Sequence, residues 1–138
     1  MKLLSRICVL LTLSFAALTA QAFEKEPFTQ DRFEELQAAG EVVLVDVFAT
    51  WCPTCAKQQN AIAAYAEANP DNNFHVLIVD FDDDKDLVRK FRAPRQSTLL
   101  LYKGSKQVWF SVAESRPEVI AAELDKAINS KSKSWVLN

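Results

Sequence analysis

Apolar residues are distributed along this chain in two kinds of pattern. Short, nearly continuous apolar runs rich in β-branched residues are typical of buried strands, and they occur at residues 42–49, 74–79, 98–102 and 107–112. Residues 103–106 would connect the last two runs as a hairpin. Apolar residues at helical spacing, bounded by capping or helix-ending residues, predict helices over residues 29–40, 53–68, 82–91 and 117–128.

The order of these elements is αβαβαββα. Strands that alternate with helices and end in an antiparallel hairpin predict an α/β domain, in which a central mixed β-sheet is flanked by helices on both faces. The chain has 138 residues, which suffices for one domain of typical size. We therefore expect a single domain over residues 23–138, after an N-terminal segment of a different kind.

Residues 1–22 have the three-part pattern of a secretory signal peptide. Lys2 and Arg6 precede an apolar run of about 12 residues, and small residues follow up to Ala22. This run is shorter than the roughly 20 residues that span a bilayer, so we expect cleavage after Ala22, with an uncleaved anchor as the alternative. Export would place the protein in an oxidising compartment, the periplasm. Since no second apolar stretch is long enough to span a membrane, we expect the mature form to be soluble, and we expect it to be a monomer.

The composition excludes several classes of function. Hydrophobic residues make up 49% of the chain and charged residues 25%, which is typical of a globular domain rather than a disordered one. The formal net charge of −2 gives no electrostatic basis for binding nucleic acid. With only two glycines, the chain has no glycine-rich loop for phosphate.

One short segment carries recognisable chemistry, and it lies where the first buried strand ends and the longest helix begins: Trp51-Cys52-Pro53-Thr54-Cys55. Pro53 favours the first helical turn and so places Cys52 at the helix N-terminus, where unpaired N–H groups stabilise a thiolate. Cys55 follows one turn later on the same face. We expect Cys52 to be the exposed nucleophile and Cys55 the more buried resolving cysteine.

Two other interpretations of this pair stay open. A static disulfide would close a very small loop and gain little stability from chain entropy. A closed zinc site needs four ligands, whereas Cys52 and Cys55 supply two, and the single histidine, His75, belongs to a different strand. We predict no metal and no cofactor, with a soft-metal-binding module that uses the cysteine pair as an alternative.

Asp46 is a second candidate residue. It shares one strand face with Val42, Leu44 and Phe48, all of which are apolar. Burial among such neighbours disfavours the charged form and raises the pKa of a carboxyl group toward the range of a proton carrier. The alternatives are an aspartate that faces the edge of the sheet and one that is locally hydrogen-bonded.

The chain resembles the thioredoxin family over roughly residues 42–128, through the segment 45–52 before the cysteine helix and the segment 98–103. The resemblance implies the thioredoxin fold and thiol–disulfide exchange through Cys52 and Cys55. In the family, a buried aspartate six residues before the first cysteine carries the proton of the resolving cysteine, and Asp46 occupies that position.

The resemblance also implies partners. Protein disulfides would be the substrates, bound at Trp51 and at the loop that contains Gln96 and Ser97. We predict a reductant rather than an oxidant, because no histidine between the cysteines stabilises the thiolate further. A membrane thiol-reductase would then be the electron donor. A disulfide-forming oxidase of the same fold is the alternative.

The sequence departs from the family pattern at two places near the cysteines. Ser97 occupies the position of the family's cis-proline, and since a cis bond before a non-proline residue costs about 2.5–4 kcal/mol, we predict a trans Gln96–Ser97 bond with the Ser97 hydroxyl near a cysteine sulfur. The family's lysine beside the buried aspartate is replaced by an apolar strand at residues 76–79. Asp46 is therefore expected to lack a cationic neighbour.

Overall fold

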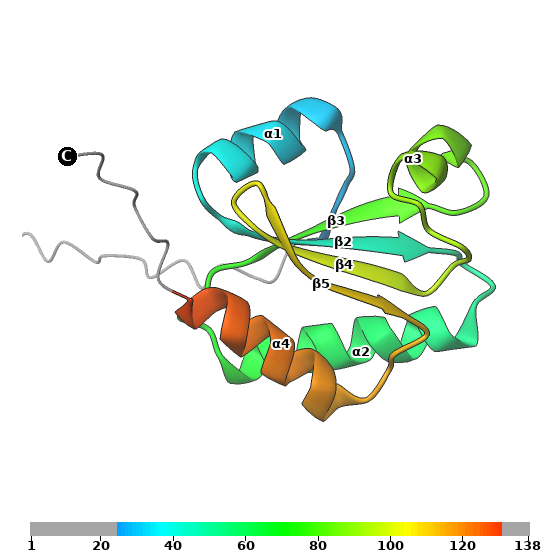
Figure 1. Cartoon of the computed structure of the whole chain (residues 1–138). Helices are drawn as coiled ribbons and strands as arrows, with labels where there is room; N and C mark the ends of the chain where they lie inside the picture. Colours follow the sequence, from blue (N-terminus) through cyan, green and yellow to red (C-terminus); the bar gives the residue numbers. More distant parts are fainter. Residues whose placement is uncertain (1–24, 131–138) are drawn as a thin grey trace, which may run out of the picture.

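The computed structural model describes residues 25–130 of the chain (Figure 1). These residues form the strands and helices β1 (Lys25–Pro27), α1 (Gln30–Ala38), β2 (Val42–Phe48), α2 (Pro53–Ala68), β3 (His75–Asp80), α3 (Lys85–Lys90), β4 (Thr98–Lys103), β5 (Lys106–Val112) and α4 (Pro117–Asn129). The segment interpreted as a signal peptide, residues 1–22, lies outside this range and stays a prediction. Within the range, no helix is both long enough and apolar enough to cross a membrane.

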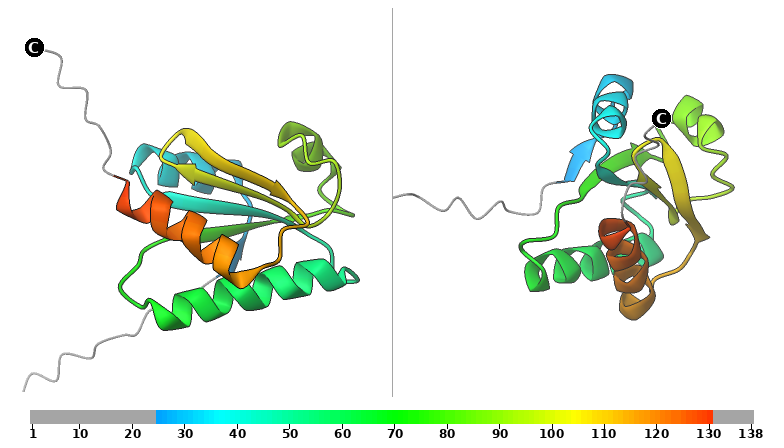
Figure 2. Two further views of the ribbon diagram at one scale, coloured as in Figure 1. Left: turned by 60° about the horizontal axis from the view of Figure 1, so that its bottom comes forward. Right: turned by 60° about the vertical axis from the view of Figure 1, so that its left-hand side comes forward.

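The strands form one mixed sheet in the spatial order β1-β3-β2-β4-β5. β1, β3 and β2 are parallel to one another, and β4 and β5 are antiparallel to their neighbours. Helices α1 and α3 lie on one face of the sheet and α2 and α4 on the other (Figures 1 and 2). The predicted α/β architecture, a mixed sheet with helices on both faces, is confirmed.

β2 is buried on both faces because its alternate residues enter two different cores. Val43, Val45 and Val47 pack with α1 and α3, whereas Val42 and Leu44 pack with α2 and α4. A strand that supplies both cores must be apolar at nearly every position, which explains the uninterrupted run in the sequence. Asp46 is the one polar residue of this strand, and it faces α2.

The strand β1 was not expected from the sequence. This strand has only three residues, Lys25, Glu26 and Pro27, which carry no apolar alternation. It pairs with β3 at the outer edge of the sheet, where a proline is tolerated because its missing N–H is not needed by a second neighbour. The observed order is therefore βαβαβαββα, with an added strand before the predicted elements.

Three segments meet at the end of the sheet where β2 stops. The chain leaves β2 and enters α2 through Cys52, the N-cap of that helix. β4 begins at this end, with Thr98 opposite Val47, and β5 finishes there, with Val112 opposite Thr98. The start of α2, the loop before β4 and the loop after β5 are thus placed side by side.

Candidate active site

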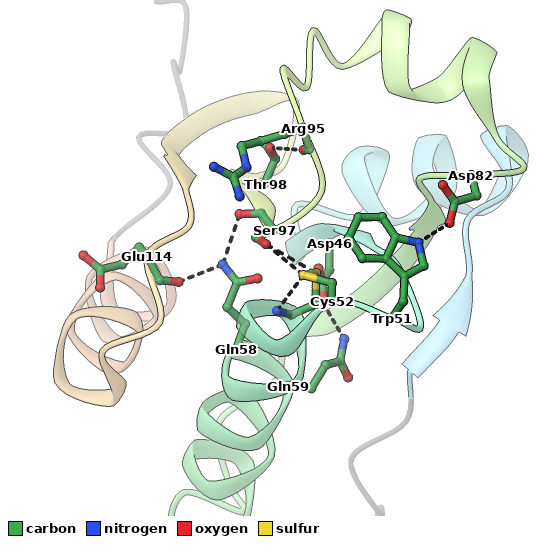
Figure 3. The surroundings of a disulfide bond; sticks show 11 residues. Asp46, Trp51, Cys52, Gln58, Gln59, Asp82, Arg95, Ser97, Thr98 and Glu114 are labelled. Carbon is green, nitrogen blue, oxygen red and sulfur yellow. Dashed lines mark hydrogen bonds between the residues drawn. A yellow bond between two sulfur atoms is a disulfide. The ribbon is translucent and has the colours of Figure 1, made fainter.

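The Cys52–Cys55 pair lies at the start of α2 (Figure 3). The two cysteines form a disulfide, and their Cα atoms are 5.3 Å apart. The Cys52 Sγ accepts a hydrogen bond from the Cys55 N–H at 3.1 Å, and Pro53 occupies the first turn of the helix. The Cys52 sulfur therefore lies at the helix N-terminus and accepts a hydrogen bond from one of its free N–H groups, an environment that stabilises a thiolate once the disulfide is reduced.

Neither sulfur-bearing residue is open to solvent. Cys52 is 4% exposed and Cys55 is 0% exposed. The expectation that Cys52 is exposed is therefore wrong, although Cys55 is the more buried of the two cysteines, as expected. Both cysteines pack with Ala49 in a small cluster of their own, and the loop before β4 contacts them from the other side. The little exposure that remains belongs to the cysteine at the helix N-terminus.

Ser97 contacts both sulfurs. Its Oγ lies 3.1 Å from the Cys52 Sγ and 3.4 Å from the Cys55 Sγ, and the residue is completely buried. Residues 25–130 contain no cis peptide bond, so the Gln96–Ser97 bond is trans as predicted, and the predicted approach of the hydroxyl to a cysteine sulfur is confirmed. The φ angle of Ser97 is +64°, in the left-handed region that few residues other than glycine adopt.

The backbone of Ser97 is held by three hydrogen bonds. Its N–H donates to the Val47 carbonyl at 2.9 Å, and its carbonyl accepts from the Ala113 N–H at 2.8 Å and from Gln58 Nε2 at 3.1 Å. These bonds occupy the groups with which Ser97 could pair with a substrate strand. Gln96 is half-buried and makes no hydrogen bond to another residue in the described part of the chain, so its backbone groups are the ones left for such pairing.

Gln58 was not identified from the sequence, yet it connects three segments of the site. It is completely buried, and its Nε2 donates both to the Ser97 carbonyl and, at 2.7 Å, to the Glu114 carbonyl (Figure 3). Its Oε1 is buried without a hydrogen-bond partner. Its spacing could have identified it, because a residue three positions after Cys55 lies on the same face of the helix as that cysteine.

Asp46 is completely buried beneath α2. Its Oδ2 accepts a hydrogen bond from Gln59 Nε2, while its Oδ1 has no partner. Burial raises the pKa of Asp46 from 3.8 to about 7, and the Gln59 hydrogen bond and the charge of Lys25 offset part of that rise. The expected buried carboxyl with a raised pKa is therefore present.

The expectation that Asp46 lacks a cationic neighbour is wrong. The cation is Lys25, which comes from β1 instead of β3 and stands in register with Val76. The Lys25 Nζ donates a hydrogen bond to Gln59 Oε1, and Gln59 Nε2 donates to Asp46. Gln59 therefore connects the buried carboxyl to a positive charge at the protein surface.

Trp51 borders the disulfide with its side chain largely in solvent. It is 59% exposed, and its Nε1–H donates to Asp82 Oδ2 at 2.7 Å, which fixes the orientation of the indole (Figure 3). Asp82 follows β3, in a turn where Asp80 accepts hydrogen bonds from backbone N–H groups. Over residues 25–130, no three His, Cys, Asp or Glu side chains are grouped as a metal site would require.

Known proteins share this sequence pattern. The thioredoxin family model matches residues 24–129 of the chain. Thioredoxin-2 of Saccharomyces cerevisiae is 37% identical over 73 residues, which are 53% of this chain and 68% of that protein. Thioredoxin-2 of Pyricularia oryzae is 33% identical over 89 residues, which are 64% of this chain and 51% of that protein. The chain thus spans about half the length of the second relative.

Solved structures share the fold. Trxlp from Edwardsiella tarda EIB202 is similar with a TM-score of 0.68 and 35% sequence identity, over 73% of this chain and 98% of that one. A mutant thioredoxin from Halobacterium salinarum NRC-1 has a TM-score of 0.67 and 20% identity, over 80% of this chain and 96% of that one. The second likeness concerns the fold alone.

We expect Asp46→Asn to change how stability depends on pH. The folded-state pKa of Asp46 is raised from 3.8 to about 7, so the folded protein binds this proton more tightly than the unfolded chain and loses stability as the pH rises through that range. The variant has no such loss, so above about pH 8 its free energy of unfolding should exceed that of the wild type by roughly 4 kcal/mol. Urea unfolding of the wild type and the variant at several pH values measures this difference in the free energy of unfolding. Asp71→Asn, at an exposed carboxylate, is the control, and an equal slope in both variants would contradict the assignment.

Ala113→Gly should stabilise the protein. Ala113 has a φ of +62°, its side chain is exposed, and its N–H is bonded to Ser97. A left-handed conformation costs a non-glycine residue roughly 1–2 kcal/mol, and the greater unfolded-state freedom of glycine offsets part of the relief, which leaves a gain of about 0.5–1 kcal/mol. The matched control is Ala122→Gly, exposed within α4, which should cost about 1 kcal/mol. A loss of stability at both sites would show that the Ala113 conformation carries no strain.

Proposed function

Because the chain belongs to the thioredoxin family, whose members are thiol–disulfide oxidoreductases, we propose that it is an exported reductant that exchanges disulfides with other proteins through Cys52 and Cys55. The observation that carries this proposal is the disulfide at the N-terminus of α2, with a buried carboxyl beneath the same helix.

The exchange proceeds in two steps, starting from the reduced protein. The Cys52 thiolate attacks one sulfur of a substrate disulfide, the substrate S–S bond breaks, and a mixed disulfide forms as one substrate sulfur leaves as a thiolate. Cys55 then loses its thiol proton, attacks the Cys52 sulfur and expels the second substrate thiolate. Two electrons have passed to the substrate, the Cys52–Cys55 disulfide has formed, and the substrate thiolates take up protons.

We assign to Asp46 the role of accepting the Cys55 proton. Gln59 follows Cys55 by four residues and lies on the same face of α2, and its amide is hydrogen-bonded to Asp46. A carboxyl group whose pKa is about 7 gains and loses a proton readily at neutral pH. The hydrogen bond from Gln59 and the charge of Lys25 support this role because they keep the pKa of Asp46 from rising further.

Substrate proteins would dock around the rim of the disulfide. Trp51 supplies an exposed apolar surface whose orientation is fixed by Asp82. Gln96 supplies backbone groups that are not used within the domain, and an extended substrate segment can pair with them. Ser97, the residue that follows Gln96, contacts both sulfurs, so a substrate disulfide bound through Gln96 would be brought close to Cys52.

The direction of electron flow is proposed from the residues between the cysteines. Pro53 and Thr54 carry no charge, so the Cys52 thiolate gains no stabilisation from a cationic neighbour there, which favours a reducing pair. A reductant in an oxidising compartment must itself be reduced. We propose a membrane thiol-reductase as the donor, which forms its own disulfide as it supplies two electrons to Cys52 and Cys55.

Equilibration of the protein with glutathione buffers tests the direction. We expect a reduction potential below about −220 mV, in the range of reducing members of this fold, since nothing between the cysteines favours the thiolate strongly. A potential above about −150 mV would instead identify a disulfide-forming oxidase. In a disulfide-reduction assay, Cys52→Ser should have no activity, and Cys55→Ser should accumulate mixed disulfides. Wild-type activity in Cys52→Ser would place the chemistry elsewhere, and metal that co-purifies with the reduced protein in stoichiometric amount would favour a binding module.

Export is testable by mass spectrometry of the protein recovered from the periplasm of an expressing bacterium. The residues that support export are Lys2, Arg6 and the small residues up to Ala22. We expect the mature chain to begin at Phe23. A chain that retains Cys8 in the soluble fraction would contradict cleavage, and recovery in the membrane fraction would favour the anchor.

A further inference from the structure

A buried hydroxyl stands against the reacting sulfurs and has no part in the steps described above. We propose that Ser97 is a catalytic hydrogen-bond donor, whose Oγ–H donates to the Cys52 thiolate after reduction and so raises the reduction potential of the cysteine pair. This inference rests on the proposed disulfide exchange and adds to it a residue that sets the balance between the oxidised and reduced forms.

The chemistry of the oxidised pair fixes which atom is the donor. The sulfurs of a disulfide carry no hydrogen, so in the contacts at 3.1 Å and 3.4 Å the Ser97 hydroxyl donates and the sulfur accepts. The described residues offer the Ser97 Oγ no other hydrogen-bond partner. The hydroxyl proton is therefore already directed at the sulfurs before any reduction occurs.

The hydroxyl is held in place by its own backbone. The three hydrogen bonds of the Ser97 N–H and carbonyl tie it to β2, to α2 and to the loop after β5. The residue keeps an unfavourable φ of +64° within this arrangement. A donor that is fixed in advance needs no rearrangement when charge appears on the sulfur, which makes its hydrogen bond more effective.

The hydrogen bond matters because the two redox states differ as acceptors. A disulfide sulfur is a weak acceptor, whereas a thiolate is charged and accepts strongly, particularly at a site that excludes water. When a donor dithiol is oxidised to its own disulfide, it passes two electrons to the pair and releases two protons. The Sγ–Sγ bond breaks, Cys55 takes up one proton, Cys52 stays a thiolate, and the second proton passes to solvent. The Cys52 sulfur then has two donors from different segments, the Cys55 N–H and the Ser97 O–H.

Other charged groups lie around the pair and must be kept constant in any test. They are Asp46 beneath α2, Asp82 on the indole of Trp51, Arg95 in the loop before β4, and Glu114 in the loop after β5 (Figure 3). Glu114 is also paired with Arg116. A change at Ser97 that removes only the hydroxyl leaves each of these groups in place, so the difference between variants isolates one hydrogen bond.

The test measures the pKa of Cys52 from the pH dependence of its alkylation rate, resolved by mass spectrometry in the reduced full chain. We expect Ser97→Ala to raise this pKa by about 1 unit, since a hydrogen bond to a charged group is worth that much. The equilibrium constant with glutathione should shift about tenfold toward the disulfide, which lowers the potential by about 30 mV.

Two further variants separate the loss of the hydroxyl from any change in the conformation of the loop. Ser97→Gly also removes the hydroxyl but suits a positive φ, so it should raise the pKa as much as Ser97→Ala even if the alanine variant folds poorly. Thr98→Val removes the adjacent buried hydroxyl, which donates to the Arg95 carbonyl instead of a sulfur, and should leave the Cys52 pKa unchanged. An unchanged pKa in Ser97→Gly, or an equal shift in Thr98→Val, overturns the inference.

The outcome is distinguishable from failure of the proposed function. A wild type that does not reduce protein disulfides, yet shows a Cys52 pKa that rises in Ser97→Gly, would refute the proposed substrate and keep the hydrogen bond. If the wild type reduces disulfides but Ser97→Gly has the same Cys52 pKa and reduction potential as the wild type, the hydrogen bond is refuted and the proposed function stands.

Discussion

The antiparallel pairing of β4 with β2 is the constraint on which the site depends. Thr98 stands opposite Val47, and the Ser97 N–H donates to the Val47 carbonyl, so the residue before β4 is fixed where β2 gives way to the cysteine helix. β5 extends this arrangement, because Val112 stands opposite Thr98 and brings Ala113 to the carbonyl of Ser97. A slip of one residue in the register would turn every side chain of β4 to the opposite face and carry Ser97 away from the sulfurs.

The polar and strained features of the domain are concentrated at this end of the sheet. The buried polar residues are Asp46, Gln58, Ser97 and Thr98, and two of their atoms, Asp46 Oδ1 and Gln58 Oε1, have no hydrogen-bond partner. Ser97 and Ala113, which lie side by side in two different loops, have positive φ angles, and the Ala113 N–H donates a hydrogen bond to the Ser97 carbonyl. Each feature costs free energy that the two apolar cores on either side of β2 offset. Such violations of ordinary folding preferences are expected where chemistry requires a fixed donor or a buried carboxyl.

The sequence predicted those features of the fold that depend on residues close together in the chain. The apolar runs located β2 to β5, and Pro53 located the start of α2 and hence the sulfur at its N-terminus. The sequence could not show β1, whose three residues have no apolar pattern, nor the amide contacts of Gln58 and Gln59, since nothing in the spacing of helix residues tells which buried group an amide will meet. The low exposure of Cys52 escaped prediction for the same reason, because it depends on a loop 45 residues further along the chain.

Lys25 shows how a long-range electrostatic requirement can be met from an unexpected segment. Asp46 stands opposite Ile78 in β3, and Pro27 stands opposite Ile78 from the other side, so β1 runs one strand beyond the carboxyl. Lys25 lies two residues before Pro27, and its long flexible side chain reaches the amide that is bonded to Asp46. Because Lys25 is exposed while Asp46 is buried, solvent screens its charge, and desolvation remains the larger influence on the carboxyl. The pKa of Asp46 therefore stays near 7, which leaves the carboxyl able to exchange a proton at neutral pH instead of being held in its charged form by an ion pair.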